Sequence, residues 1–226
     1  MRPPLWYRID YWAFTILARL FVGYRVEGQH HEPPPPFIVI ANHNSAFDIA
    51  MMGINLRAWV TFVAKGEMAE KRVVRAWLHS SGSFCVRRGE PDRAAVRKGL
   101  EVLRRGGVLG IFAEGTRSPD GRMRHFEEGA AYWALRAGVP VLPMGIAGSH
   151  RAMPAGAKWP RRSPVVVRIG PPIPVPKVEG RLTREIIMEW TRRFEEVVAA
   201  LLPPDQQPLP GEVKGASAPQ APAAST

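Results

Sequence analysis

Short apolar runs alternate with helix-like segments along most of the chain, and this alternation constrains the fold more than any other feature. The apolar runs cover residues 37–42, 61–65, 83–88, 108–114, 139–148 and 164–170. Helical patterns separate several of these runs, and the last helical pattern, at about 183–202, carries an apolar stripe. Strands that alternate with helices form βαβ units. We therefore expect an α/β domain whose mostly parallel central sheet is flanked by helices.

The charge of the chain favours anionic partners. Its 226 residues include 31 Lys and Arg against 20 Asp and Glu, a formal net charge of +11. Such a balance fits nucleic acid, an acidic membrane face or phosphorylated small molecules. The arginines are scattered, and the sequence has neither a helix-turn-helix pattern nor an aromatic RNA-binding signature, so we expect no nucleic-acid partner.

The single cysteine, Cys85, excludes an internal disulfide, and the chain has no Cys/His zinc spacing. Cys85 stands within an apolar run, where a buried core cysteine is favoured over a nucleophile. We therefore expect a reducing compartment and no metal site.

At the amino terminus, residues 5–24 form the most aromatic stretch of the chain. The longest uncharged run within it, residues 11–18, is far shorter than the roughly 20 apolar residues that span a bilayer. On a helix the aromatic side chains recur at three- or four-residue steps with arginines around them, a pattern typical of a helix in the lipid headgroup region. The alternative is an amphipathic helix packed on the protein's own core.

These patterns divide the chain into three parts. We expect residues 1–28 to be an interfacial amphipathic segment and residues 29–203 to be the folded domain. Residues 204–226 are rich in Pro, Ala, Gln, Gly and Ser and have few large apolar side chains. Too little apolar surface is present there to offset the entropy of ordering, so we expect a disordered tail.

A histidine and an aspartate follow the first buried strand. His43 leaves the carboxyl end of the run 37–42, where open α/β sheets place their ligands. Asp48 comes five residues later, in the opening turn of a helix, and its carboxylate can turn back to accept from the imidazole Nδ1–H. Nε2 then faces the cleft as a general base. The alternative is structural, with His43 as a polar helix-opening residue and Asp48 as an acid stabilised by the helix dipole.

Three further segments end or interrupt strands. Residues 112–118 place Gly115, Thr116 and Arg117 directly after the strongest strand, in a tight turn whose arginine fork suits a phosphate. The alternative is an ordinary turn with a solvated arginine. Residues 82–88 deliver two arginines at the end of a strand, and residues 139–143 form a strand entered and broken by prolines.

In this order and at these separations, the four segments resemble the motifs of the lysophospholipid acyltransferase family, and most closely those of its bacterial 1-acyl-sn-glycerol-3-phosphate acyltransferases. The resemblance runs from about residue 37 to residue 148, roughly half of the chain, and includes residues 64–67 after the second strand. It implies the glycerolipid acyltransferase fold for residues 29–203.

The resemblance also implies a role for each matching residue. His43 would be the base that takes a proton from the free hydroxyl of the lysolipid, and Asp48 would orient its imidazole. The residues implied in binding the glycerol phosphate are Arg88, Glu114, Gly115, Thr116 and Arg117. Lys65 and Pro143 occupy positions on the acyl-donor side of the site.

One departure from the family pattern concerns the phosphate site. Glu127 stands where the family usually carries a lysine after a phenylalanine. A reversed charge near an anionic substrate weakens binding unless the side chain points away. We expect the nearby Arg87, Arg122 and Arg124 to compensate.

The implied reaction moves an acyl group from acyl-CoA or acyl-carrier protein to the free hydroxyl of 1-acylglycerol 3-phosphate, giving phosphatidic acid for phospholipid biosynthesis. We expect direct transfer in a ternary complex, with no acyl-enzyme, metal or bound cofactor. Backbone N–H groups around Gly115, or in the run 139–148, are candidates to stabilise the oxyanion that develops on the thioester.

Alternatives are another acceptor, either glycerol 3-phosphate or a lysolipid such as an ornithine lipid, and a non-catalytic lipid-binding relative. The expected partner besides the substrates is an anionic phospholipid surface. We expect the protein to lie at the cytoplasmic face of the cell membrane as a peripheral protein.

Overall fold

The computed structural model describes residues 22–66, 81–86, 92–154, 156–157 and 159–209. The strands within this part of the chain are β1 (Tyr24–Glu27), β2 (Phe37–Ala41), β3 (Val60–Lys65), β4 (Phe84–Val86), β5 (Val108–Phe112), β6 (Val141–Ala147) and β7 (Val165–Ile169). The α-helices are α2 (Phe47–Ile54), α4 (Arg93–Arg104), α5 (Gly129–Ala137), α6 (Ser149–Ala152) and α7 (Arg184–Ala200). Two short 3₁₀ turns, η1 (Gln29–His31) and η3 (Pro204–Gln206), complete the set.

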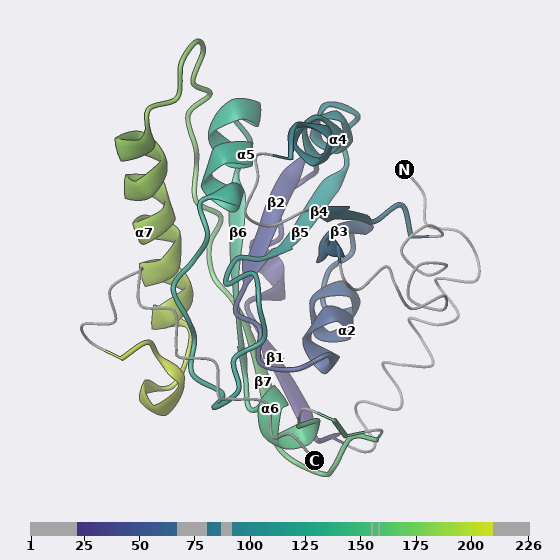
Figure 1. Cartoon of the computed structure of the whole chain (residues 1–226). Helices are drawn as coiled ribbons and strands as arrows, with labels where there is room; N and C mark the ends of the chain where they lie inside the picture. The colour runs from purple at the N-terminus through teal and green to yellow at the C-terminus, as the bar shows by residue number, and fades with distance from the viewer. Residues whose placement is uncertain (1–21, 67–80, 87–91, 155, 158, 210–226) are drawn as a thin grey trace, which may run out of the picture.

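The seven strands form a sheet in the order β1-β7-β6-β2-β5-β3-β4 (Figure 1). Every neighbouring pair is parallel except β6 and β7, which run antiparallel. The prediction of a mostly parallel sheet with flanking helices is therefore confirmed. The central strand β2 lies between β5 and β6, so the loops that follow these three strands meet at one edge of the sheet.

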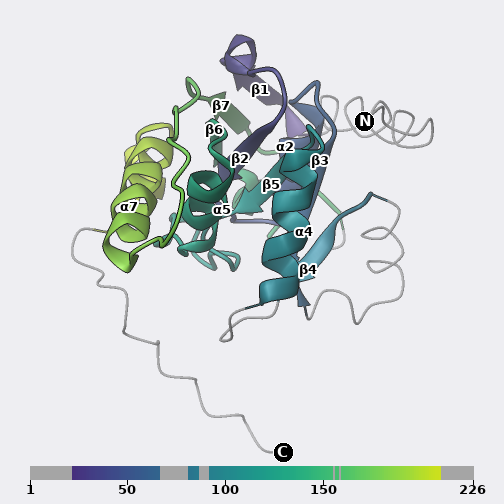
Figure 2. The ribbon, with the colours of Figure 1, turned by 90° about the horizontal axis from the view of Figure 1, so that it is seen from above.

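Both faces of the sheet are covered. Since the side chains of a strand alternate between its two faces, each strand contributes to the packing on both sides. On β2, Ile38 and Ile40 pack with Trp133 of α5 and Phe194 of α7, while Phe37 faces the cluster that includes α2. Figure 2 shows α7, α5 and α4 side by side over the first face. The near-continuous apolar sequence of β2 thus reflects burial on both sides, as parallel strands require.

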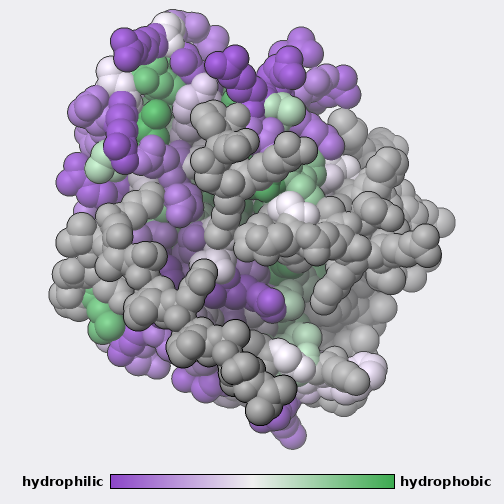
Figure 3. Space-filling model, in the orientation of Figure 1, coloured by the Kyte–Doolittle hydropathy of each residue, from purple (hydrophilic) through white to green (hydrophobic). Residues whose placement is uncertain are grey.

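The outer helices carry their charge on the solvent side. The upper end of the molecule, over α7 and α4, is mainly hydrophilic in the surface view, with smaller apolar areas between (Figure 3). On α4 the Asp92 side chain accepts from the Ala95 N–H at 2.9 Å, which satisfies one of the free donors at the helix start. Arg93 and Arg97 of this helix are exposed.

The ends of the chain differ from the expected boundaries. Tyr24–Glu27 forms strand β1, which pairs in parallel with β7, so the sheet begins before residue 29. At the other end Gln206 is buried: its Oε1 accepts from the Gly148 N–H at 3.0 Å and its carbonyl accepts from the Met123 N–H at 2.8 Å. Residues 204–209 therefore belong to the folded part, because these hydrogen bonds are long-range and invisible in the local composition.

The predicted aromatic helix at residues 5–24 lies, up to residue 21, outside the described residues, as does the tail from residue 210. Among the helices that are described, none is both long enough and apolar enough to cross a lipid bilayer.

Candidate active site

The register of the sheet brings two sequence motifs together. Ala41 at the end of β2 pairs with Phe112 at the end of β5. His43 and Glu114 each stand two residues beyond this pair, at the carboxyl edge where open α/β sheets bind ligands. The loops are joined directly, since the Ser118 N–H donates to the His43 carbonyl at 2.8 Å and the Ala113 N–H donates to the Ala41 carbonyl at 3.2 Å.

His43 and Asp48 lie in contact in this edge. The His43 Nδ1 is 3.1 Å from the Asp48 Oδ2, and the same oxygen accepts from the backbone N–H groups of Asn44 at 2.6 Å and Ser45 at 2.7 Å. Because this carboxylate oxygen is an acceptor, the proton of the neutral imidazole is assigned to Nδ1, which donates to it. Nε2 is then the acceptor nitrogen. Asp48 is fully buried, whereas the His43 side chain keeps 13% of its surface exposed. The imidazole is therefore oriented from within and accessible from outside.

The ring of His43 is held on its flat face as well. It stacks on Phe112, with ring centroids 4.1 Å apart and planes inclined by 20°. Packing on one face and a hydrogen bond at Nδ1 leave the imidazole little freedom to turn. Such restraint is what a general base needs, because proton transfer depends on geometry before it depends on pKa.

Glu114 supports this loop from beneath. Its side chain is buried, and its Oε1 accepts from the His43 backbone N–H at 2.8 Å. Burial raises the pKa of Glu114 to about 8, although hydrogen bonds from the backbone N–H groups of His43 and Arg124 partly oppose the shift. The carboxyl is therefore largely protonated at neutral pH. This geometry makes Glu114 a positioning residue for the His43 loop, which differs from the phosphate contact that the resemblance implies.

The raised pKa of Glu114 predicts a distinctive dependence of stability on pH. Between about pH 4.5 and 8 the folded protein holds a proton on Glu114 that the unfolded chain has released, so this group lowers the free energy of unfolding as the pH rises. Its share of the slope approaches about 1.4 kcal/mol per pH unit within this window. Glu114→Gln removes the proton exchange and should flatten that part of the slope. Urea unfolding of both proteins from pH 5 to 8 measures the difference, and a constant difference across that range would contradict the assignment.

Two asparagines that the sequence left without a role lock the His43 loop to its neighbours. The fully buried Asn42 donates through Nδ2 to the Ile146 carbonyl at 2.9 Å, and its Oδ1 accepts from the Ile146 N–H at 2.7 Å. Asn44 donates through Nδ2 to the Gly121 carbonyl at 3.1 Å. An amide side chain directly after a fully buried strand must find partners there, and this requirement is the signal that points to Asn42.

The turn at residues 113–118 depends on the backbone conformation of its glycine. Gly115 has φ of 68°, in the left-handed region that favours glycine, and its N–H donates to the Phe112 carbonyl at 3.0 Å. That amide is therefore occupied within the turn, which removes the Gly115 N–H itself from the candidate donors around Gly115. The N–H groups of Thr116 and Arg117 make no hydrogen bond within the described residues.

Arg117 extends from this turn into solvent. Its side chain is exposed, and its guanidinium has no ion-pair partner among the residues that the structure describes. Arg124, in contrast, pairs through Nη2 with the Asp120 Oδ2 at 2.9 Å, and Arg122 donates to the Gln207 carbonyl at 3.3 Å. The compensation that we expected from Arg122 and Arg124 is thus limited by these partners.

The remaining predicted residues fall in different places. Lys65 is the last residue of β3 and pairs with Val86 of β4, which puts its backbone at the carboxyl edge. Pro143 is buried within β6, opposite Ile40 of β2, and its carbonyl accepts from the Gly170 N–H at 2.9 Å. It is therefore part of the sheet core and not of the edge. Arg87 and Arg88 lie outside the described residues. Glu127 is described, and its side chain is exposed.

The fold and the edge described above define a class of proteins. The sequence model of the family described as "Acyltransferase" matches residues 23–147, which spans β1 to β6 and includes both joined loops. The chain belongs to this family.

Individual relatives agree with that assignment. The chain is 28% identical to a chloroplastic 1-acyl-sn-glycerol-3-phosphate acyltransferase of Arabidopsis thaliana over 65% of its own length and 42% of that protein. It is 34% identical to the lyso-ornithine lipid O-acyltransferase of Pseudomonas aeruginosa over 67% of its length and 58% of that protein. The crystal structure of the 1-acyl-sn-glycerophosphate acyltransferase of Thermotoga maritima superposes with a TM-score of 0.65 at 28% identity, covering 86% of this chain and 77% of that one. The chain thus spans less than two thirds of these two sequence relatives.

Proposed function

We propose that the chain transfers an acyl group from a thioester to the free hydroxyl of 1-acylglycerol 3-phosphate, forming phosphatidic acid. The observation that carries this proposal is the imidazole of His43, oriented by Asp48 and Phe112 beside the Arg117 turn. The names of the Arabidopsis and Thermotoga relatives support the same acceptor. The donor is acyl-CoA or acyl-carrier protein, and no bound cofactor is needed, because the thioester already activates the acyl group.

The proton moves through Nε2 of His43. The base removes the proton of the lysolipid hydroxyl as its oxygen attacks the thioester carbonyl carbon, and Asp48 stabilises the imidazolium that forms. When the carbon–sulfur bond breaks, the imidazolium returns the proton to the thiolate that leaves. A positioned base of this kind contributes about 10²- to 10⁴-fold in rate.

Negative charge on the thioester oxygen needs donors that are already in place. Since the Gly115 N–H is engaged by Phe112, the free N–H groups of Thr116 and Arg117 are the candidates within this turn. Direct transfer without an acyl-enzyme fits the state of Cys85, because burial raises the pKa of its thiol and so lowers the fraction of nucleophilic thiolate.

The proposal is tested with purified full chain, labelled acyl-CoA and lysophosphatidic acid. Labelled phosphatidic acid is the expected product, in proportion to enzyme and time. Labelled protein after incubation with donor alone would instead indicate an acyl-enzyme and exclude direct transfer.

A second acceptor is favoured by one comparison, the 34% identity with a lyso-ornithine lipid O-acyltransferase. The guanidinium of Arg117, which has no ion-pair partner among the described residues, distinguishes the two acceptors, because a guanidinium binds a phosphate through charge-assisted hydrogen bonds. Arg117→Ala should raise KM for lysophosphatidic acid by about tenfold or more and leave kcat within about threefold, since the contact is present before and during transfer.

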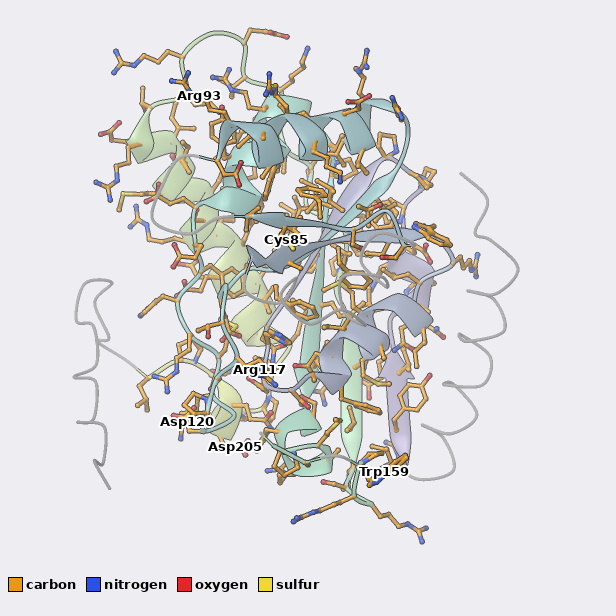
Figure 4. The ribbon with its side chains drawn as sticks, turned by 45° about the vertical axis from the view of Figure 1, so that its right-hand side comes forward. Cys85, Arg93, Arg117, Asp120, Trp159 and Asp205 are labelled. Carbon is orange, nitrogen blue, oxygen red and sulfur yellow. The ribbon has the colours of Figure 1, made fainter. Side chains whose placement is uncertain are left out.

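The matched control for this variant is Arg93→Ala, which removes another exposed arginine at the far end of the molecule (Figure 4). Steady-state kinetics with lysophosphatidic acid and with lyso-ornithine lipid give KM for each acceptor. If KM for lysophosphatidic acid is the same in wild type and Arg117→Ala, the phosphate assignment fails and the second acceptor is preferred.

We also propose that the protein acts as a peripheral protein at the cytoplasmic face of the cell membrane. Both the acceptor and the product are lipids, and the net charge of +11 favours an anionic phospholipid surface. The aromatic and arginine-rich sequence at residues 5–24 supports an interfacial anchor.

A further inference from the structure

One loop at the edge of the sheet presents a tryptophan to solvent. Trp159 is 82% exposed, more than any other large hydrophobic side chain among the described residues. It lies in the Trp159 loop, which we define as the described residues 153–154, 156–157 and 159–163, between α6 and β7. Isolated exposed apolar residues are common and need no explanation by themselves. The surroundings of Trp159 are what distinguish it.

The charged residues of this loop are all basic. Arg161 and Arg162 are both exposed, and neither has an ion-pair partner within the described part of the chain. The sequence contains no Asp or Glu between Glu128 and Glu179. An ion pair of the preceding helix α6, between Arg151 Nη1 and Asp205 Oδ2, is long at 3.9 Å and exposed on both sides. An indole beside unpaired arginines is the combination that favours a headgroup layer containing anionic lipid.

The loop is anchored to the candidate active site. The Ser45 hydroxyl, three residues from Asp48, donates to the Met153 carbonyl at 2.7 Å. The Arg161 N–H donates to the Ala152 carbonyl at 2.6 Å, which closes the loop onto α6. Within the loop the Ala157 N–H donates to the Pro154 carbonyl at 3.1 Å. These bonds hold the base of the loop, so its position relative to His43 is set by the fold.

The position of the loop follows from the sheet. It succeeds β6, which runs parallel to β2, and therefore leaves the sheet at the same edge as the His43 loop. Figure 4 places Trp159 at the end of the molecule opposite Arg93, the end that also carries Arg117, Asp120 and Asp205. A surface that binds Trp159 therefore lies close to the edge of the sheet where the lysolipid is expected to bind.

We propose that the Trp159 loop is a membrane contact: Trp159 enters the headgroup layer of an anionic phospholipid bilayer while Arg161 and Arg162 bind lipid phosphates. This contact is distinct from the amino-terminal segment and turns the active-site edge toward the bilayer. The inference rests on the proposed function only in that its substrates are lipids. Charge complementarity selects the bilayer over a second copy of this chain, because two copies would bring the same arginines together.

The test measures partition of the full-length protein onto vesicles by sedimentation. With vesicles of phosphatidylcholine and phosphatidylglycerol, Trp159→Ala and the double variant Arg161→Ala/Arg162→Ala should each reduce the partition coefficient by about fivefold or more. The arginine variant should have little effect on pure phosphatidylcholine vesicles. The controls are Met188→Ala, another exposed apolar residue, and Arg93→Ala/Arg97→Ala, another exposed arginine pair; both should bind within about twofold of wild type.

A spectroscopic arm identifies the inserted side chain. The chain has seven tryptophans, so the contribution of Trp159 is taken as the difference between wild type and Trp159→Phe. Brominated lipid should quench the fluorescence assigned to Trp159 in this way. Phe is used because it keeps an aromatic side chain for insertion but lacks the indole fluorescence. The proposal is overturned if both loop variants have the partition coefficient of the wild type. It is also overturned if the control variants lose as much partition as the loop variants. Loss of self-association without loss of vesicle binding overturns it in favour of a second copy.

The outcome is separable from that of the proposed function. If vesicle binding depends on Trp159 but no lysolipid is acylated, the proposed reaction fails and the membrane contact stands. If acylation occurs and vesicle binding ignores Trp159, only the contact fails.

Discussion

Replacing His43 with alanine should lower kcat for acyl transfer by about 10²- to 10⁴-fold, the contribution of a positioned general base. The lysolipid hydroxyl then loses its proton to water, which is neither oriented nor held beside the thioester. KM for the acceptor should change by less than about threefold, because the imidazole contributes little to ground-state binding in this mechanism. Initial rates with labelled acyl-CoA and lysophosphatidic acid measure both constants.

The control for His43→Ala is His30→Ala, an exposed histidine near the start of the fold. It should leave kcat, KM and the melting temperature unchanged. The His43 variant also loses its stacking on Phe112, so its melting temperature is recorded to confirm that it is folded at the assay temperature. A folded His43→Ala protein that retains transfer within tenfold of wild type refutes the role of His43 as the base.

Much of the fold was readable because its strands are buried on both faces. Runs such as 108–112 are continuously apolar, and their alternation with helical patterns predicts the parallel sheet. Strand β1 was missed, since its four residues alternate between partly buried and exposed and its pairing with β7 joins residues about 140 positions apart. Local patterns carry no information about such a partner.

At the candidate site, too, contacts between residues close in the sequence were easier to predict than contacts between distant residues. The contact of His43 with Asp48 spans five residues and depends on one turn, so the spacing makes it possible and the structure shows that it forms. The bond from the His43 N–H to Glu114 spans 71 residues and depends on the register of β2 against β5. The resemblance implies a phosphate contact for Glu114, whereas the structure turns its buried carboxyl toward the His43 backbone. The Asn42 bonds to Ile146 depend on the neighbouring strand β6 in the same way.

Asp48→Asn should lower kcat by about 10³- to 10⁴-fold while the protein stays folded, as expected when a buried carboxylate that orients a catalytic histidine becomes an amide. The amide oxygen can replace Oδ2 and keep the N–H donors of Asn44 and Ser45. Its NH₂ group then takes the place of Oδ1, which is buried without a partner among the described residues. An unsatisfied buried donor costs about 1 to 3 kcal/mol, so we expect a lower melting temperature and intact folding.

Two measurements separate this orienting role from a merely structural one. If Asp48 acts through His43, Asp48→Asn loses kcat at unchanged KM, and the double variant with His43→Ala is no slower than His43→Ala alone, because the two side chains work as a unit. If Asp48 only holds the loop, the two losses multiply and KM rises with them. Asp205→Asn, which neutralises an exposed aspartate outside the site, provides the matched control and should retain wild-type kinetics. Losses of kcat that multiply in the double variant would therefore remove Asp48 from the proton-transfer mechanism.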